Sequence, residues 1–119
     1  MYKYKAKVTR VVDGDTVDLL IDVGFNIHIK ERARLYGIDA PESRTRDLEE
    51  KKRGLASKAR LIEILESFGD TIVVKTTIEK GKYGRLLAEL LSLDGDQNAN
   101  QMLISEGHAT EYFGGKKTK

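Results

Sequence analysis

RLYGIDAPES, residues 34–43, is the stretch that decides how this chain folds. It holds the only proline of the chain, Pro41, between two acids, Asp39 and Glu42. Proline fixes its own φ angle and pushes the preceding residue, Ala40, into an extended conformation. The stretch therefore predicts a rigid strand end that keeps two carboxylates at a set separation. Taken alone, the pattern fits either a functional site or a turn whose acids face water.

The chain before this stretch is patterned as β-strands. Tyrosine, alanine and valine alternate with lysines near the N-terminus, which predicts a half-buried strand. A tight turn is expected at Asp13-Gly14, and a second turn at residues 24–26. Three strands are expected here, over residues 2–8, 17–21 and 27–38.

The chain after this stretch changes period. The charged residues 44–53 are expected to form a mobile loop, and a helix is expected over residues 55–67. An earlier helix start at Asp47 is the alternative, and it would place Gly54 inside the helix. The apolar stripe of this helix is expected to consist of Leu55, Ala59, Ile62 and Leu65.

Two more strands and a second helix complete the pattern. The strands are expected over residues 71–79 and 85–93, joined by a turn at residues 82–84. A short helix at residues 98–106 ends at Gly107, and residues 114–119 are expected to fray.

This element order predicts the fold class. Three strands, a helix, two strands and a helix give a β-rich α+β domain, and a five-stranded OB-type barrel has this order. No internal repeat or linker is visible, so residues 1–119 are expected to form one domain.

Composition excludes several classes of protein. Lysine and arginine number 21 and aspartate and glutamate 19, so the net charge of +2 rules out a histone-like polycation but permits a local basic patch. The absence of cysteine removes disulfides and thiolate zinc sites. Apolar runs are too short to span a membrane, and no signal peptide begins the chain. An intracellular location is expected unless a leader has been removed.

Acids and arginines supply the candidate chemistry. Asp15, in VVDGDT at residues 11–16, reads either as part of a hairpin tip or as a ligand of a hard cation such as Ca²⁺. Arg34 and Arg85 carry planar guanidinium groups suited to phosphate oxygens, although each alone could simply face solvent. Together with Asp39 and Glu42, they suit metal-assisted phosphodiester hydrolysis if the fold brings the three acids together.

Four motifs in order give the chain a family resemblance. VVDGDTV, RLYGIDAPE, KYGR and EGHA, between Val8 and Phe113, resemble the staphylococcal nuclease (thermonuclease) family. The resemblance implies an OB-type barrel with two or three packed helices. It also implies a Ca²⁺-dependent endonuclease that cleaves DNA and RNA, prefers single-stranded or frayed regions and leaves 3′-phosphate ends.

The resemblance also implies roles for individual residues. Asp15 and Asp39 match the calcium-binding aspartates, and the backbone carbonyl of Ala40 matches a further ligand. Glu42 matches the general base. The phosphate-gripping arginines correspond to Arg34 and Arg85, and residues that contact the substrate correspond to Lys82, Tyr83, Tyr112 and Phe113.

The chain departs from the best-known family member in three places. Ala40 replaces a threonine, which removes a hydroxyl but keeps the carbonyl. Only Phe113, beside Tyr112, falls in register with a base-stacking aromatic pair, because the second position is Gly115. The chain stops where that member continues into a third helix, so part of that buttress is expected to be missing or replaced.

Two alternatives to the enzyme remain open on sequence grounds. One is a non-catalytic OB-type module that binds nucleic acid through basic and aromatic side chains. The other is a scaffold with a vestigial cleft. In each case no protein partner and no membrane is expected, and the chain is expected to be a monomer. His28 and His108 lack a second ligand at metal spacing and are interpreted as structural or solvated.

Overall fold

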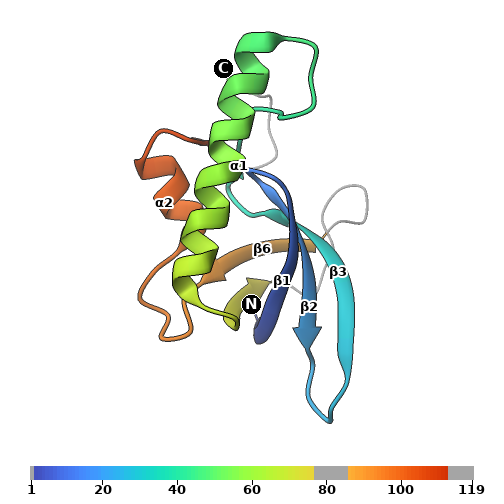
Figure 1. Ribbon diagram of the computed structural model, residues 1–119. Coiled ribbons are helices and arrows are strands. Elements are labelled where there is room, and N and C mark those ends of the chain that lie inside the picture. Colours follow the sequence, from blue (N-terminus) through green and yellow to red (C-terminus); the bar gives the residue numbers. More distant parts are fainter. Residues whose placement is uncertain (1, 77–85, 113–119) are drawn as a thin grey trace.

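Five strands close into a barrel in the computed structural model of the chain, which describes residues 2–76 and 86–112 (Figure 1). Neighbouring strands follow the order β1-β2-β3-β6-β5, and every pair is antiparallel except β3 with β6. The expected OB-type barrel is therefore confirmed. Its strands are β1 (Tyr2–Asp13), β2 (Thr16–Asp22), β3 (His28–Leu35), β5 (Ile72–Thr76) and β6 (Leu86–Leu91).

The long strand β1 pairs with one neighbour along each of its edges. Residues 2–6 pair with β5, and residues 5–13 pair with β2. The register with β2 shifts after Val8 and again after Val11. Such bulges bend and twist a strand, which helps a sheet to close on itself. Alternate side chains of the strands fill the barrel, with the largest fully buried ones on this face being Val17, Leu19, Leu35, Ile72, Val74 and Leu90.

Helix α1 (Leu48–Phe68) begins earlier than the main sequence interpretation placed it. Asp47 caps it by accepting hydrogen bonds from the backbone N–H groups of Glu49 and Glu50, at 3.0 and 3.2 Å. The predicted loop over 44–53 is therefore wrong for its second half, and the alternative start at Asp47 is correct. Local capping and acids in the first turn stabilise a helix start that apolar periodicity alone does not reveal.

The buried face of α1 also differs from the expected stripe. Leu65 is buried as predicted, but Leu55 and Ile62 are 48% and 37% exposed. The face that packs inward carries small residues at its N-terminal end, because the barrel and a neighbouring chain segment approach the helix closely there. It consists of Gly54, Ser57, Leu61, Ile64 and Leu65.

The expected third strand is split in two. After β3, Gly37 adopts a positive φ of 82° and turns the chain, so β4 (Ile38–Asp39) leaves the barrel. β4 pairs instead with β7 (Thr110–Glu111), which the sequence pattern did not predict. Asp39 consequently lies beside a segment that is 71 residues further along the chain, at Thr110.

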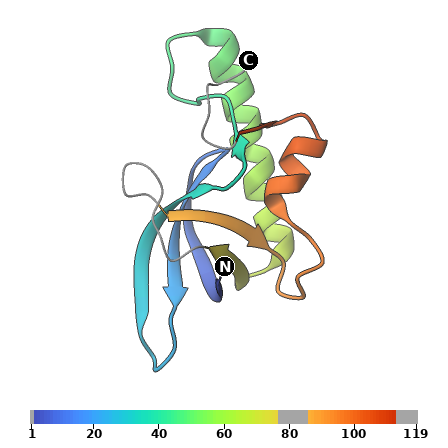
Figure 2. The same cartoon turned by 180° about the vertical axis from the view of Figure 1, so that it is seen from behind.

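Helix α2 (Ala99–Ser105) agrees with its prediction. Asn98 caps its start, and Gly107 follows its end with a positive φ of 80°. Both views place α2 beside α1, and the N-terminal part of α1 extends past the strands (Figures 1 and 2). Within the described ranges, no helix is both long and apolar enough to cross a bilayer.

Candidate functional site

Three charged side chains from separate parts of the chain meet at the end of β3. The guanidinium of Arg34 lies 3.2 Å from Asp15 through Nη1 and 3.1 Å from Asp39 through Nη2. Nη2 also donates to the carbonyl oxygen of Ile38 at 3.2 Å. The three side chains are only 10–17% exposed. The structure thus brings together three of the predicted site residues and holds them with little solvent screening.

Asp15 is fixed by the turn between β1 and β2. Its Oδ1 accepts a hydrogen bond from the Thr16 hydroxyl, and its Oδ2 accepts one from the backbone N–H of Ala40, both at 3.0 Å. Its backbone carbonyl accepts the N–H of Leu35 at 2.8 Å. Asp15 is thereby tied to β3 and to the IDAPE stretch, 25 residues away at Ala40.

A glycine in the same turn allows the turn to pack on α1. A Cβ atom added to Gly14 would lie 2.7 Å from the Cβ of Ser57 and 3.1 Å from the Cβ of Ala40. Neither distance leaves ordinary room for a side chain. Residue 14 is therefore a point where the turn, the IDAPE stretch and α1 converge.

The last described residues lie against this cluster. The Tyr112 N–H donates to the Gly37 carbonyl at 2.9 Å, and the Tyr112 ring centroid is 5.5 Å from the Cζ of Arg34. That separation is within the range of a cation–π contact. Tyr112, which the sequence interpretation placed among the substrate-contacting residues, thus packs on a charged residue of the cluster.

Glu42 lies on a fixed segment just beyond the cluster. Its side chain is exposed, whereas the next residue, Ser43, is 3% exposed. The Glu42 N–H donates to Oε2 of Glu50 in α1 at 3.2 Å, and the Ser43 hydroxyl donates to the Asp13 carboxylate. The backbone that carries Glu42 is therefore held from two sides.

The oxygen atoms near this cluster are of the kinds that bind a hard cation. Asp15 and Asp39 supply carboxylate oxygens and Ala40 a backbone carbonyl, which are the ligands that Ca²⁺ prefers. In residues 2–76 and 86–112, no group of three or more acidic, histidine or cysteine side chains stands at metal-binding distance. Arg34 lies between Asp15 and Asp39, and the convergence of all three acids on one cation stays a prediction.

A second Arg–Asp pair joins strands β2 and β3. Nε of Arg32 is 2.7 Å from Asp18, and this hydrogen bond with the guanidinium lowers the pKa of the Asp18 carboxyl below its ordinary value. The Arg32 side chain is 51% exposed, against 16% for Arg34. The exposed pair of Arg32 and Asp18 can therefore serve as a control for substitutions in the largely buried pair of Arg34 and Asp15.

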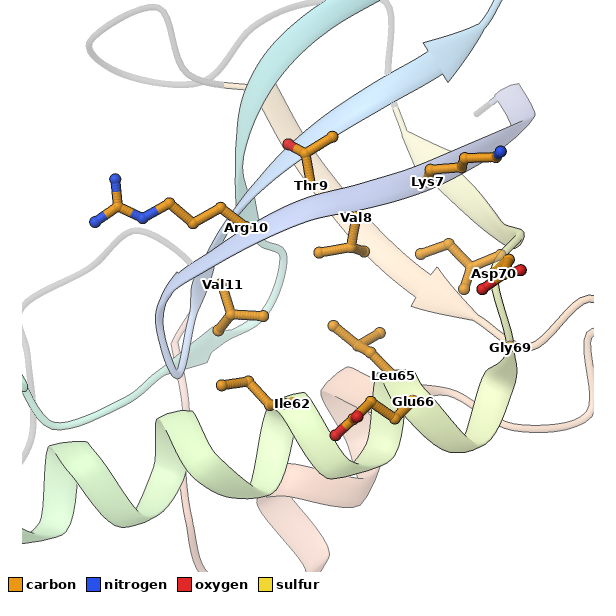
Figure 3. Close-up of a pocket in the computed structure, with 11 residues that line it drawn as sticks. Lys7, Val8, Thr9, Arg10, Val11, Ile62, Leu65, Glu66, Gly69 and Asp70 are labelled. Atoms are coloured by element: carbon orange, nitrogen blue, oxygen red, sulfur yellow. The ribbon is translucent and has the colours of Figure 1, made fainter.

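A groove of about 620 Å³ lies elsewhere, between β1 and α1 (Figure 3). Val8 and Val11 face Ile62 and Leu65 across it, as the close-up shows. Its rim combines basic residues of β1 with acidic residues that follow or end α1, so it does not suit a phosphate backbone. None of the predicted site residues that the structure describes lines this groove.

Four predicted site residues lie outside the described residues, namely Lys82, Tyr83, Arg85 and Phe113. Conversely, sequence reasoning missed positions that hold the site together, namely Thr16, Glu50, Gly54 and Thr110. The available signal was a glycine inside an otherwise helical pattern, which often marks a close packing contact.

Comparisons with known proteins give a family match and similar relatives. The sequence model of the staphylococcal nuclease homologue family matches residues 32–119. Endonuclease YhcR of Bacillus subtilis (strain 168) is 36% identical over 116 residues, which cover 93% of this chain and 9% of that protein. Protein ParB of Escherichia coli is 31% identical over 115 residues, which cover 91% of this chain and 57% of that protein. The chain therefore spans less than two thirds of either relative.

Proposed function

Because this chain belongs to the staphylococcal nuclease family, we propose that it is a Ca²⁺-dependent endonuclease that hydrolyses phosphodiester bonds of DNA and RNA. Endonuclease YhcR, a relative by sequence, carries the same activity class in its name. The observation that supports the proposal is the position of Arg34, whose guanidinium is held between the carboxylates of Asp15 and Asp39.

Arg34 is the group that we assign to the phosphate. Its planar guanidinium can donate two parallel hydrogen bonds to phosphate oxygens, which a lysine cannot do. Low solvent exposure strengthens this interaction, because water screens a partly buried charge less. Arg34 would thus stabilise the negative charge that develops on the phosphoryl oxygens as a nucleophile adds. Arg85, outside the described residues, is proposed to share this role.

Glu42 is proposed as the general base. Its carboxylate takes a proton from a water molecule, whose oxygen forms the new bond to phosphorus. The bond from phosphorus to the 5′ oxygen breaks, and that oxygen gains a proton. The products are a 3′-phosphate and a 5′-hydroxyl. The rigid backbone around Glu42 supports this assignment, since a base must be held near the atom that it deprotonates.

The cation is proposed to be held by Asp15, Asp39 and the backbone carbonyl of Ala40. When bound, Ca²⁺ would polarise a phosphate oxygen and offset its negative charge. The loss of a hydroxyl at Ala40 does not remove the proposed carbonyl ligand. Tyr112 is proposed to contact the substrate beside Arg34, with Lys82, Tyr83 and Phe113 in the same role.

One experiment separates this nuclease from a module that only binds nucleic acid. Glu42→Gln keeps the size of the side chain but removes the proposed base, and general base catalysis typically contributes ~10²–10⁴-fold in rate. Affinity for a single-stranded oligonucleotide is measured by fluorescence anisotropy in Ca²⁺, and cleavage by gel on the same preparation. We expect unchanged or slightly tighter binding and cleavage slower by orders of magnitude.

Glu49→Gln is the matched control, because it removes the same charge from an exposed residue at the start of α1. It should cleave at the wild-type rate. Binding without cleavage by the wild-type protein under any divalent ion would favour the binding module. Wild-type cleavage by Glu42→Gln would leave the nuclease standing but remove Glu42 as its base.

A further inference from the structure

The backbone of Glu42 lies directly on helix α1 at Gly54. A Cβ atom added to Gly54 would stand 2.3 Å from the carbonyl oxygen of Glu42, 2.4 Å from its carbonyl carbon and 2.6 Å from the nitrogen of Ser43. All three are backbone atoms, so no side-chain rotation can relieve the contact. Any residue other than glycine would force the segment away from the helix.

We propose that Gly54 is a positioning residue, whose missing side chain sets where the Glu42 carboxylate stands relative to the Asp15–Arg34–Asp39 cluster. The inference rests on the proposed function, because it concerns the placement of the proposed base. It assigns a role in the reaction to a residue that touches neither substrate nor cation.

The cost of a glycine at this position supports the inference. Gly54 lies inside α1, where glycine is clearly less favourable than alanine. The chain accepts this cost in the seventh residue of a 21-residue helix, where no turn or positive φ requires glycine. What the position does provide is the contact with Glu42 and Ser43.

Two hydrogen bonds also hold the Glu42–Ser43 backbone in place. Glu50, one helical turn before Gly54, accepts the Glu42 N–H at 3.2 Å. Ser43 is anchored to Asp13 at the other end of the peptide unit. The Glu42–Ser43 backbone is therefore held by its contact with Gly54 and by these two hydrogen bonds. The exposed Glu42 side chain extends from a backbone that cannot easily shift.

Gly54→Ala tests the proposal in two backgrounds, wild type and Glu42→Gln. A misplacement of about 1 Å can cost ~10²-fold in rate, so we expect cleavage to fall at least tenfold in the wild-type background. Oligonucleotide affinity should change little. In the Glu42→Gln background the same substitution should cost less than about threefold, because the group that it misplaces has already been removed.

Ala56→Gly is the control, since it exchanges the same two residue types at an exposed position of the same helix. It should lower the melting temperature and leave cleavage by the folded protein unchanged. Equal losses from Gly54→Ala in both backgrounds would overturn the positioning role and leave a purely structural one. Absence of cleavage by the wild-type protein would instead overturn the proposed function itself.

Glu50 gives a second test if Gly54→Ala does not fold. Glu50→Ala removes the acceptor of the Glu42 N–H, whereas Glu50→Gln keeps a side-chain oxygen that can accept it. We expect cleavage to fall severalfold in Glu50→Ala and to be largely restored in Glu50→Gln, without a matching change in affinity. Identical cleavage by both Glu50 variants and the wild type would overturn the proposal that the contacts with α1 position Glu42.

Discussion

The guanidinium of Arg34 lies 3.2 Å from the carboxylate of Asp15, although 19 residues separate them in sequence. The antiparallel register of β2 and β3 creates this contact, because Thr16 stands directly opposite Arg34. The turn that precedes Thr16 delivers Asp15 to the same place. The sequence pattern alone could explain the turn between β1 and β2 as a simple hairpin tip. In the structure this turn contributes Asp15 to the charged cluster.

Arg34→Lys should impair cleavage although it keeps the positive charge. A lysine cannot present the planar pair of donors that Arg34 directs at Asp15 and Asp39. Losing a charge-stabilising donor at a reacting centre typically costs ~10²–10³-fold in kcat. We expect a fall of this order in single-turnover cleavage at saturating oligonucleotide, with a folded protein by circular dichroism.

Arg32→Lys is the control for this prediction. Arg32 lies on β3 like Arg34, but it pairs with Asp18 of β2 on an exposed surface. Its replacement should leave cleavage within about twofold, because exposed ion pairs contribute little. Wild-type cleavage by Arg34→Lys would show that its guanidinium plays no part in the reaction.

Asn100→Ala should destabilise the fold more than its polar character suggests. Asn100 is fully buried, and its amide donates to the carbonyls of Tyr36 and Ala88 while its oxygen accepts the N–H of Leu90. Alanine would remove all three hydrogen bonds, and each buried backbone group left unsatisfied typically costs ~1–3 kcal/mol. Asn98→Ala, which removes only the cap of α2, should cost less in a urea unfolding experiment.

Acid should weaken the link between the two helices. Arg60 of α1 forms two hydrogen bonds with Glu106 after α2, at 2.6 and 3.0 Å, and this contact lowers the pKa of Glu106 below its ordinary value. A carboxyl with a lowered folded-state pKa stabilises the fold above its unfolded-state pKa. That contribution is lost as the pH falls through the folded-state pKa.

Glu106→Gln should therefore lower the melting temperature at neutral pH and have less effect in acid. The difference between wild type and Glu106→Gln should be constant above the unfolded-state pKa of the carboxyl and should shrink as the pH falls from there through the folded-state pKa of Glu106. High salt should reduce it as well, since both side chains are about one third exposed. A difference that is constant over this pH range would show that the ion pair does not contribute.

The barrel was predictable because its signals are local. Alternation in β2, the β-branched residues of β5, the turn at Asp13-Gly14 and the glycine after α2 each specify their own element. The buried face of α1 was not predictable in this way. Its contacts at Gly54 and Ser57 depend on which distant segments pack against the helix. Small and polar residues also do not contribute to a periodic pattern of apolar residues.

The residues of the candidate site were predictable from the sequence, but the contacts between them were not. The motif order identified Asp15, Arg34, Asp39 and Glu42, and the first three meet in the structure. That Arg34 stands between the two aspartates follows from the strand register and from Gly37, which redirects β4. The pairing of β4 with β7, which brings Tyr112 to Arg34, involves short segments with no strand pattern of their own.

Ca²⁺ should stabilise the folded protein as well as enable cleavage. A ligand that binds only the native state adds about 2.7 kcal/mol at a hundredfold excess over its Kd. The melting temperature should therefore rise with Ca²⁺, rise further with a nucleotide present, and return to its starting value with EDTA. Differential scanning calorimetry measures this rise without relying on activity.

Two aspartate variants decide where the ion binds. Asp15→Asn removes a proposed ligand charge, so it should abolish most of the rise in melting temperature caused by Ca²⁺, whatever its effect on the starting value. Asp18→Asn removes the same charge from the exposed pair with Arg32 and should leave the rise intact. An equal rise in both variants would place the cation away from Asp15. No rise in the wild type, together with equal digestion in Ca²⁺ and in EDTA, would rule out the metal assignment.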